Sequence, residues 1–112
     1  MGIFRKKDKI PKDINSVEFR RYMARKIDGR KVRYVLEREE SNDRVIGKDG
    51  FLSVYGDELS IICGEKTLFR AKIDGLTACW EFLSLEGVTL TAFDLTTSRE
   101  RTVMAYYKYY RD

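Results

Sequence analysis

Pairs of turn residues divide the chain after Gly29 into short segments, and their spacing restricts the fold more than any other feature of the sequence. Two of the pairs, Gly56-Asp57 and Gly64-Glu65, are two-residue hairpin signals. Two more, Asp74-Gly75 and Glu86-Gly87, interrupt the apolar segments that follow. The segments lack the intervening helices that a parallel sheet needs, so the strands are expected to pair antiparallel.

About seven strands are predicted, and their short, regular spacing favours an antiparallel sandwich or barrel. In the first strand Val32, Tyr34 and Leu36 are expected to share one face. Lys48-Asp49-Gly50 is expected to form a turn or a bulge. The predicted strands cover residues 32–37, 45–46 continued at 51–55, 58–63, 66–73, 76–85, 88–94 and 102–110.

One helix is predicted before the strands, at about residues 15–27. Asn15 can cap it, and Glu18 three residues later completes a capping box. Asp28-Gly29 supplies the end of the helix. One apolar stripe recurs at helical spacing and is formed by Phe19, Tyr22, Met23 and Ile27. We expect this stripe to pack on the sheet, because a helix of this length is marginal by itself.

The 112 residues suffice for one domain. Residues 1–13 are predicted to be a flexible basic lead-in, because they hold few apolar side chains whose burial could offset the entropy of ordering. Residues 14–112 are predicted to form the single domain. The fold class is therefore mainly β with one N-terminal helix.

Positive charge is concentrated at the start of the chain. Residues 1–35 carry 12 Lys and Arg against four Asp and Glu, whereas residues 36–112 carry 10 against 14. A positive front half can attract an acidic partner, anionic lipid or nucleic acid, or it can simply be a solvated face. The candidate binding residues are Arg20, Arg21, Arg25, Lys26, Arg30, Lys31 and Arg33.

The last predicted strand is rich in tyrosine, with Tyr106, Tyr107, Tyr109 and Tyr110 near its end. These rings either fill the core and lie under the helix, or form an exposed platform for bases or for a partner. Few residues follow this strand to cover it, and an uncovered edge invites pairing with another chain. We therefore expect a homodimer through this strand, unless it pairs with the first strand.

Several classes of chemistry are unlikely from composition. The chain has no histidine, which removes histidine bases, nucleophiles and metal ligands. Cys63 and Cys79 stand in apolar contexts without metal-site spacing and are expected to be buried free thiols. We predict a non-enzyme with no cofactor and no metal. The absence of a recognisable signal peptide or membrane-spanning segment favours the cytoplasm.

The segment Gly50-Phe51-Leu52-Ser53-Val54-Tyr55-Gly56-Asp57-Glu58-Leu59-Ser60-Ile61, with the strand at 66–73, resembles the opening of bacterial pleckstrin-homology-like and GRAM-like domains. The resemblance covers about residues 32–110 and implies a small β-barrel. That family closes one end of the barrel with a C-terminal helix, which this sequence lacks. The helix at 15–27, or a second chain, would have to take its place, and no family binding residue carries over.

The function predicted from the sequence is a non-catalytic binding or scaffolding module. A protein partner or an anionic lipid surface would contact its basic face. The alternative is a nucleic-acid-binding protein that uses the basic helix and exposed tyrosines.

Overall fold

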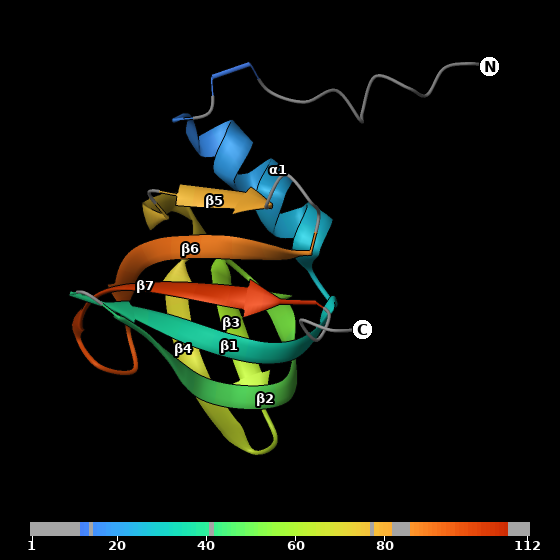
Figure 1. Cartoon of the computed structure of the whole chain (residues 1–112). Coiled ribbons are helices and arrows are strands. Elements are labelled where there is room, and N and C mark those ends of the chain that lie inside the picture. The colour runs from blue at the N-terminus through green and yellow to red at the C-terminus, as the bar shows by residue number, and fades with distance from the viewer. Residues whose placement is uncertain (1–11, 14, 41, 77, 82–85, 108–112) are drawn as a thin grey trace.

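The computed structural model describes residues 12–13, 15–40, 42–76, 78–81 and 86–107, with the backbone alone at 78–81. One α-helix and one short 3-10 helix accompany the strands (Figure 1). The elements are α1 (Val17–Ile27), β1 (Lys31–Glu39), β2 (Asn42–Tyr55), β3 (Glu58–Cys63), β4 (Lys66–Lys72), η2 (Ile73–Gly75), β5 (Ala78–Glu81), β6 (Gly87–Asp94) and β7 (Arg99–Tyr106). Of the predicted lead-in, only Lys12 and Asp13 lie within the described residues.

Helix α1 is capped one residue later than predicted. The hydroxyl of Ser16, not the side chain of Asn15, accepts the hydrogen bond from the N–H of Phe19, at 3.1 Å. Ser16 is itself held by Asp13, whose carbonyl oxygen accepts from the Ser16 hydroxyl at 2.7 Å. This places Ser16 where its oxygen reaches the third helical N–H, the usual geometry of a helix cap.

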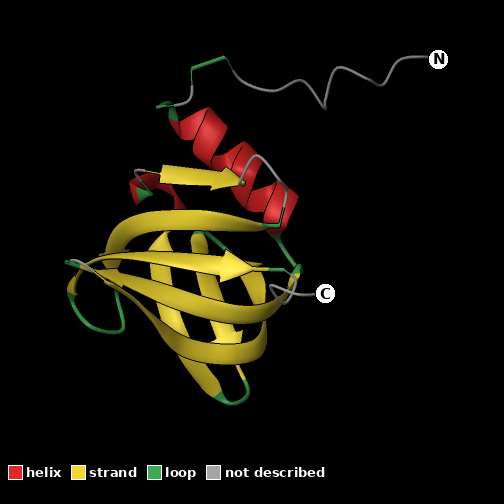
Figure 2. Cartoon of the chain, viewed as in Figure 1, coloured by secondary structure: helices red, strands yellow, loops and turns green. Residues whose placement is uncertain are grey.

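The predicted apolar stripe of α1 is confirmed. Phe19, Met23 and Ile27 are buried, Tyr22 is half-buried against the same core, and Ala24 joins them. Their partners in the core come from most strands, including Leu52, Leu59, Ile61, Phe69, Leu76, Val88, Leu90 and Val103. The helix thus supplies one wall of the core, and Figure 2 shows it at one end of the sheet.

The strands of the described residues form one antiparallel sheet of seven strands, in the order β4-β3-β2-β1-β7-β6-β5. Figure 1 shows β3 and β4 behind β1, β7 and β6, so the sheet is strongly bent. Just after the end of β6, the N–H of Leu95 donates a hydrogen bond to the carbonyl of Arg70 on β4, at 2.7 Å. The edge strands β4 and β5 are not paired with each other, so the sheet is open and the predicted closed barrel is not formed. A closed barrel would require hydrogen bonds between the edge strands β4 and β5. The short strand β5 is contacted by α1 instead of by β4.

The last strand is an interior strand of this sheet. β7 pairs with β1 on one side, with Val35 opposite Ala105, and with β6 on the other. The unpaired edge expected there is therefore absent, and the reasoning that led to a dimer through its backbone was wrong. Dimerisation itself stays a prediction.

The face assignment within β1 was also wrong. Val32, Val35 and Glu37 are buried, while Tyr34 and Leu36 are half-buried, so the period of two is broken between Val32 and Val35. Asp49 on the neighbouring strand has a positive φ of 54°, and the β1–β2 register shifts between Val35 and Leu36. Such irregularities bend strands and re-aim side chains. The turn or bulge predicted at Lys48-Asp49-Gly50 is not formed: β2 is continuous there and keeps its register with β1, and only the positive φ of Asp49 departs from regular strand geometry.

We predict that Phe19→Ala lowers the free energy of unfolding by roughly 3–5 kcal/mol, because the ring is almost fully buried between α1 and the sheet. Urea denaturation followed by circular dichroism measures this loss. Arg25→Ala on the exposed side of the same helix is the control, with an expected change within about 0.5 kcal/mol. A Phe19→Ala loss as small as that of the control would mean that α1 does not stabilise the core.

Candidate functional site

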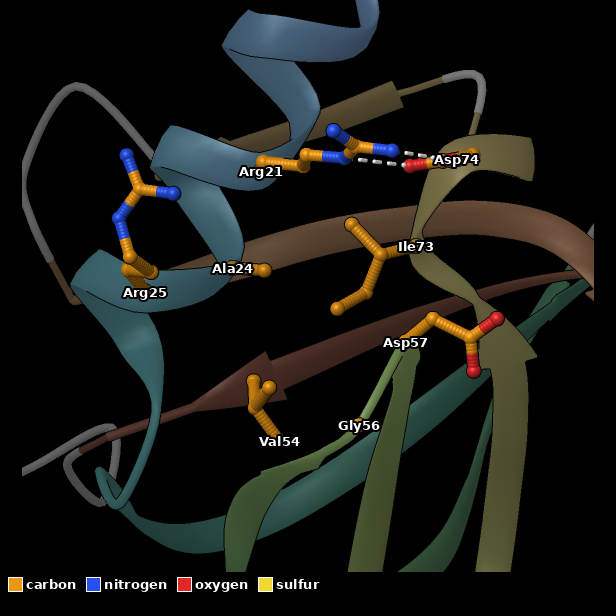
Figure 3. Close-up of a pocket in the computed structure, with 8 residues that line it drawn as sticks. All are labelled: Arg21, Ala24, Arg25, Val54, Gly56, Asp57, Ile73 and Asp74. Atoms are coloured by element: carbon orange, nitrogen blue, oxygen red, sulfur yellow. Dashed lines mark hydrogen bonds and ion pairs between the residues drawn. The ribbon is translucent and has the colours of Figure 1, made fainter.

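A pocket of about 370 Å³ lies between α1, the β2–β3 turn and η2 (Figure 3). We call it the helix–hairpin pocket. Its volume falls in the range of small-ligand and side-chain pockets in proteins. Its lining residues come from three separate parts of the chain and are Arg21, Ala24, Arg25, Val54, Gly56, Asp57, Ile73 and Asp74.

The inner surface of the helix–hairpin pocket is apolar. Ala24 and Ile73 are buried side chains of the hydrophobic core, and Val54 is partly buried against that core. Figure 3 shows these three side chains between the helix and the hairpin. A bound apolar group would therefore remain in contact with the core rather than with water.

An ion pair joins the helix to η2 along one side of the pocket. Arg21 donates two hydrogen bonds to the carboxylate of Asp74, from Nε at 3.0 Å and from a terminal nitrogen at 2.8 Å. Arg20 donates to the backbone carbonyl of Asp74 at 2.7 Å. The hydrogen bonds from Arg21 lower the pKa of Asp74 and raise the pKa of Arg21, so both groups remain charged and paired.

The hairpin side of the pocket is also held in place. The carbonyl of Asp57 accepts from the N–H of Ile73 at 2.8 Å, and Val54 donates its N–H to the carboxylate of Asp28 at 2.8 Å. Gly56 has a positive φ of 63°, as the predicted turn requires. These contacts fix the turn relative to both helices, so the pocket is formed before any ligand binds.

Arg25 is the uncompensated charge of the pocket. Arg21 is paired with Asp74, and the carboxylate of Asp57 accepts from Lys72 at 3.2 Å. Arg25 is exposed and makes no hydrogen bond or ion pair with any residue that the structure describes. The pocket therefore combines an apolar floor with one unpaired arginine at its edge, whose guanidinium extends away from Ala24 and Ile73 (Figure 3) and is free to bind an anionic group outside the floor.

The seven predicted basic residues do not form a single face. Arg21 and Arg25 line the helix–hairpin pocket, whereas Lys31 and Arg33 line a second pocket on the β1–β2 surface. Arg20 is bound to η2, and the Arg30 guanidinium lies 3.9 Å from the centre of the Tyr107 ring. Lys26 is exposed and has an interaction within the chain.

The described tyrosines of the last strand make contacts within the chain. The ring of Tyr106 stacks on that of Tyr34, with centroids 4.7 Å apart and planes 9° from parallel. Tyr107 lies beneath Arg30. Both rings are half-buried, which favours the expectation that they pack internally. Tyr109 and Tyr110 lie outside the described residues.

Comparison with known proteins adds no further assignment. The chain matches no family model, no curated protein and no solved structure. No helix in the described part of the chain is long and apolar enough to span a membrane.

A buried cluster of three charged side chains, absent from the sequence-based predictions, lies on the core side of the sheet. Glu37 is 3% exposed, Asp94 is 0% exposed and Arg101 is 8% exposed. Arg101 donates two hydrogen bonds to Glu37, at 2.9 and 2.8 Å, and one to Asp94 at 2.6 Å. It also donates to the carbonyl of Leu68 at 2.9 Å. We call Glu37, Asp94 and Arg101 the buried charge triad.

Asp94 also organises the turn between β6 and β7. Its carboxylate accepts hydrogen bonds from the N–H of Arg70 and of Thr96, both at 3.0 Å, and from the hydroxyls of Thr96 and Thr97, both at 2.7 Å. Burial by itself would raise the pKa of Asp94. The hydrogen bonds from Arg101, Thr96 and Arg70 outweigh burial and hold that pKa well below its usual range.

Glu37 is likewise held in its charged form. The hydrogen bonds from Arg101 lower the pKa of Glu37 against the opposing effect of burial, with smaller help from the charges of Arg99 and Arg44. Those two arginines approach Glu37 at 3.7 and 3.8 Å. Neither carboxylate is a base poised near neutral pH, which is what acid–base catalysis requires.

Cys63 is the cysteine whose side chain the structure describes, and it is a free thiol. Burial raises the pKa of the half-buried Cys63 thiol, which makes it less nucleophilic at neutral pH. Cys79 has no described side chain. Within the described ranges, no group of acidic or cysteine side chains is placed to hold a metal ion.

We predict that Arg101→Met lowers the free energy of unfolding by roughly 3–5 kcal/mol, because it leaves two carboxylates buried without their partner. Chemical denaturation at neutral pH measures the loss. Arg44→Met removes an exposed guanidinium of β2 that also approaches Glu37, and it is expected to have a much smaller effect. Similar losses for both variants would contradict a special role for Arg101.

Acid is expected to weaken the fold through the same cluster. The pKa values of Glu37 and Asp94 lie below their ordinary values of 4.5 and 3.8, so the unfolded chain takes up protons first as the pH falls. Their stabilising contribution is complete above those ordinary values and is lost as the pH falls through the folded-state values. Denaturation at pH values between about 7 and about 2 should show this loss, and Asp94→Asn should flatten the profile. An unchanged profile in Asp94→Asn would exclude this explanation.

Proposed function

We propose that the chain is a non-catalytic binding module whose helix–hairpin pocket accepts an apolar side chain beside an acidic group of a partner protein. The observation that carries this proposal is the unpaired guanidinium of Arg25 at the edge of an apolar, preformed pocket. Buried apolar area would supply affinity, and the carboxylate–guanidinium pair would supply orientation.

A protein segment suits this site better than a flat anionic membrane. The pocket is concave and its floor belongs to the hydrophobic core, so it receives a protruding side chain. Five of the seven predicted cations interact within the chain, and only Arg25 and Lys31 have no such interaction among the described residues, which leaves few free charges for a broad electrostatic contact. Membrane binding by electrostatics depends on several free cations acting together.

We further propose that the sheet is a variant of the pleckstrin-homology-like architecture. Support comes from the meandering antiparallel order and from the helix at one end of the bent sheet. In this chain α1, which precedes the strands, would perform the covering role that the family gives to a C-terminal helix. The open ladder between β4 and β5 is where this chain departs from a closed barrel.

The nucleic-acid alternative predicted from the sequence has less support at the residues named for it. Arg20, Arg21 and Arg30 interact within the chain, and so do Tyr106 and Tyr107. Bases would have to displace these contacts before stacking on either ring.

Fluorescence anisotropy with a short labelled peptide, one phenylalanine between glutamates, tests the proposed pocket. Arg25→Ala is expected to weaken binding about tenfold or more, because it removes the only uncompensated cation that lines the pocket within the described residues. Lys48→Ala removes an exposed charge outside the pocket and is the matched control. A second peptide with alanine in place of phenylalanine should bind more weakly to the unaltered protein.

Equal affinity for the two peptides would show that the phenylalanine side chain does not bind in the apolar pocket. Equal weakening by Arg25→Ala and Lys48→Ala would reduce the interaction to general electrostatic attraction. Either result would overturn the proposed function, as would the absence of binding to both peptides.

A further inference from the structure

Strand β2 displays two exposed aromatic rings on the outer face of the sheet. Phe51 is 43% exposed and Tyr55 is 88% exposed, while Leu52 between them in sequence points into the core. Side chains two residues apart on a strand share a face, so Phe51, Ser53 and Tyr55 lie in one row. Ser60 is paired with Ser53 on the adjacent strand. The two rings therefore stand at the ends of a short surface of small polar side chains.

A second pocket, of about 520 Å³, adjoins the first of these rings. Three of its lining residues are the glycines Gly29, Gly50 and Gly64, so much of its wall is backbone without side chains. Gly29 and Gly64 have positive φ values of 85° and 64°, a conformation that favours glycine at both positions. A flat ring can approach such a wall closely, with Phe51 as the aromatic surface.

A free cation stands beside Phe51. Lys31 is directly opposite Phe51 in the β1–β2 register and lines the same pocket. Lys31 is exposed, and no described residue forms an ion pair or hydrogen bond with its side chain. Arg33 and Asp49 also line the pocket, but each already interacts within the chain. The pocket therefore offers a half-exposed ring and one uncompensated ammonium group.

We propose that this surface binds single-stranded nucleic acid. One base stacks on Phe51 within the second pocket, a base further along the same nucleic-acid strand stacks on Tyr55, and Lys31 binds a backbone phosphate. Unpaired bases stack on aromatic side chains of exposed sheet faces, whatever their sequence. The bases of a duplex are not accessible to such rings.

The proposal uses residues other than those that the sequence indicated for nucleic acid. It needs neither α1 nor Tyr106 and Tyr107, which pack within the chain. It is also independent of the helix–hairpin pocket, since Arg25 lies on the helix and outside the second pocket. Peptide binding and nucleic-acid binding can thus succeed or fail separately.

Fluorescence anisotropy with labelled single-stranded oligo-dT and oligo-rA, and with a duplex of the same length, tests this inference on the full chain. Phe51→Ala and Tyr55→Ala are each expected to weaken single-strand binding roughly tenfold. Phe93→Ala removes another exposed aromatic side chain, on β6, and should leave binding unchanged. Circular dichroism of each variant checks that the fold is retained.

The salt dependence identifies the phosphate contact. Lys31→Ala should reduce the slope of log affinity against log salt by about 0.7, the value for one phosphate of a single strand. Lys48→Ala, an exposed lysine outside the second pocket, should not alter the slope. Arg25→Ala should not weaken single-strand binding.

Four results would overturn the proposal. The first is equal affinity for duplex and single strand, and the second is unchanged binding after Phe51→Ala. The third is binding of a free mononucleotide as tight as that of the oligonucleotides, which would leave Tyr55 without a base to stack. No binding to either oligonucleotide would also exclude it.

Discussion

Four strands meet at the guanidinium of Arg101. From β7 it binds Glu37 of β1, Asp94 of β6 and the carbonyl of Leu68 on β4. Because β4 and β6 are far apart in the order of the sheet, these contacts bring its two halves together without a continuous ladder. Each carboxylate would be costly to bury without its partner, so the bend of the sheet depends on the whole triad.

The bend determines which surfaces remain for binding. Helix α1 covers the core with Phe19 and Met23, and the Arg21–Asp74 pair fastens it to η2. The gap left between α1 and the β2–β3 turn is the helix–hairpin pocket. The outer face of β2 stays uncovered, and Phe51 and Tyr55 stand on it. Both proposed binding surfaces thus adjoin β2, one at its end beside the helix and one on its outer face.

Local features were largely predictable. The apolar stripe of α1 and the turns at Gly56 and Gly64 follow from spacing and from glycine's freedom to adopt a positive φ. The face pattern of β1 was not, since both Val32 and Val35 are buried although a regular strand would place them on opposite faces. The buried triad was not predictable either, since Glu37 and Arg101 are 64 residues apart and each resembles an ordinary surface charge.

The sequence by itself determined the element types, the absence of histidine chemistry and the excess of positive charge near the start. These depend on composition and on contacts within a few residues. The tertiary structure alone decided which charges are engaged and which are free: Arg21 and Arg30 are partnered, whereas Arg25 has no partner among the described residues. It also placed the last strand inside the sheet. Strand pairing and ion pairing join residues distant along the chain, and local propensity carries no information about such partners.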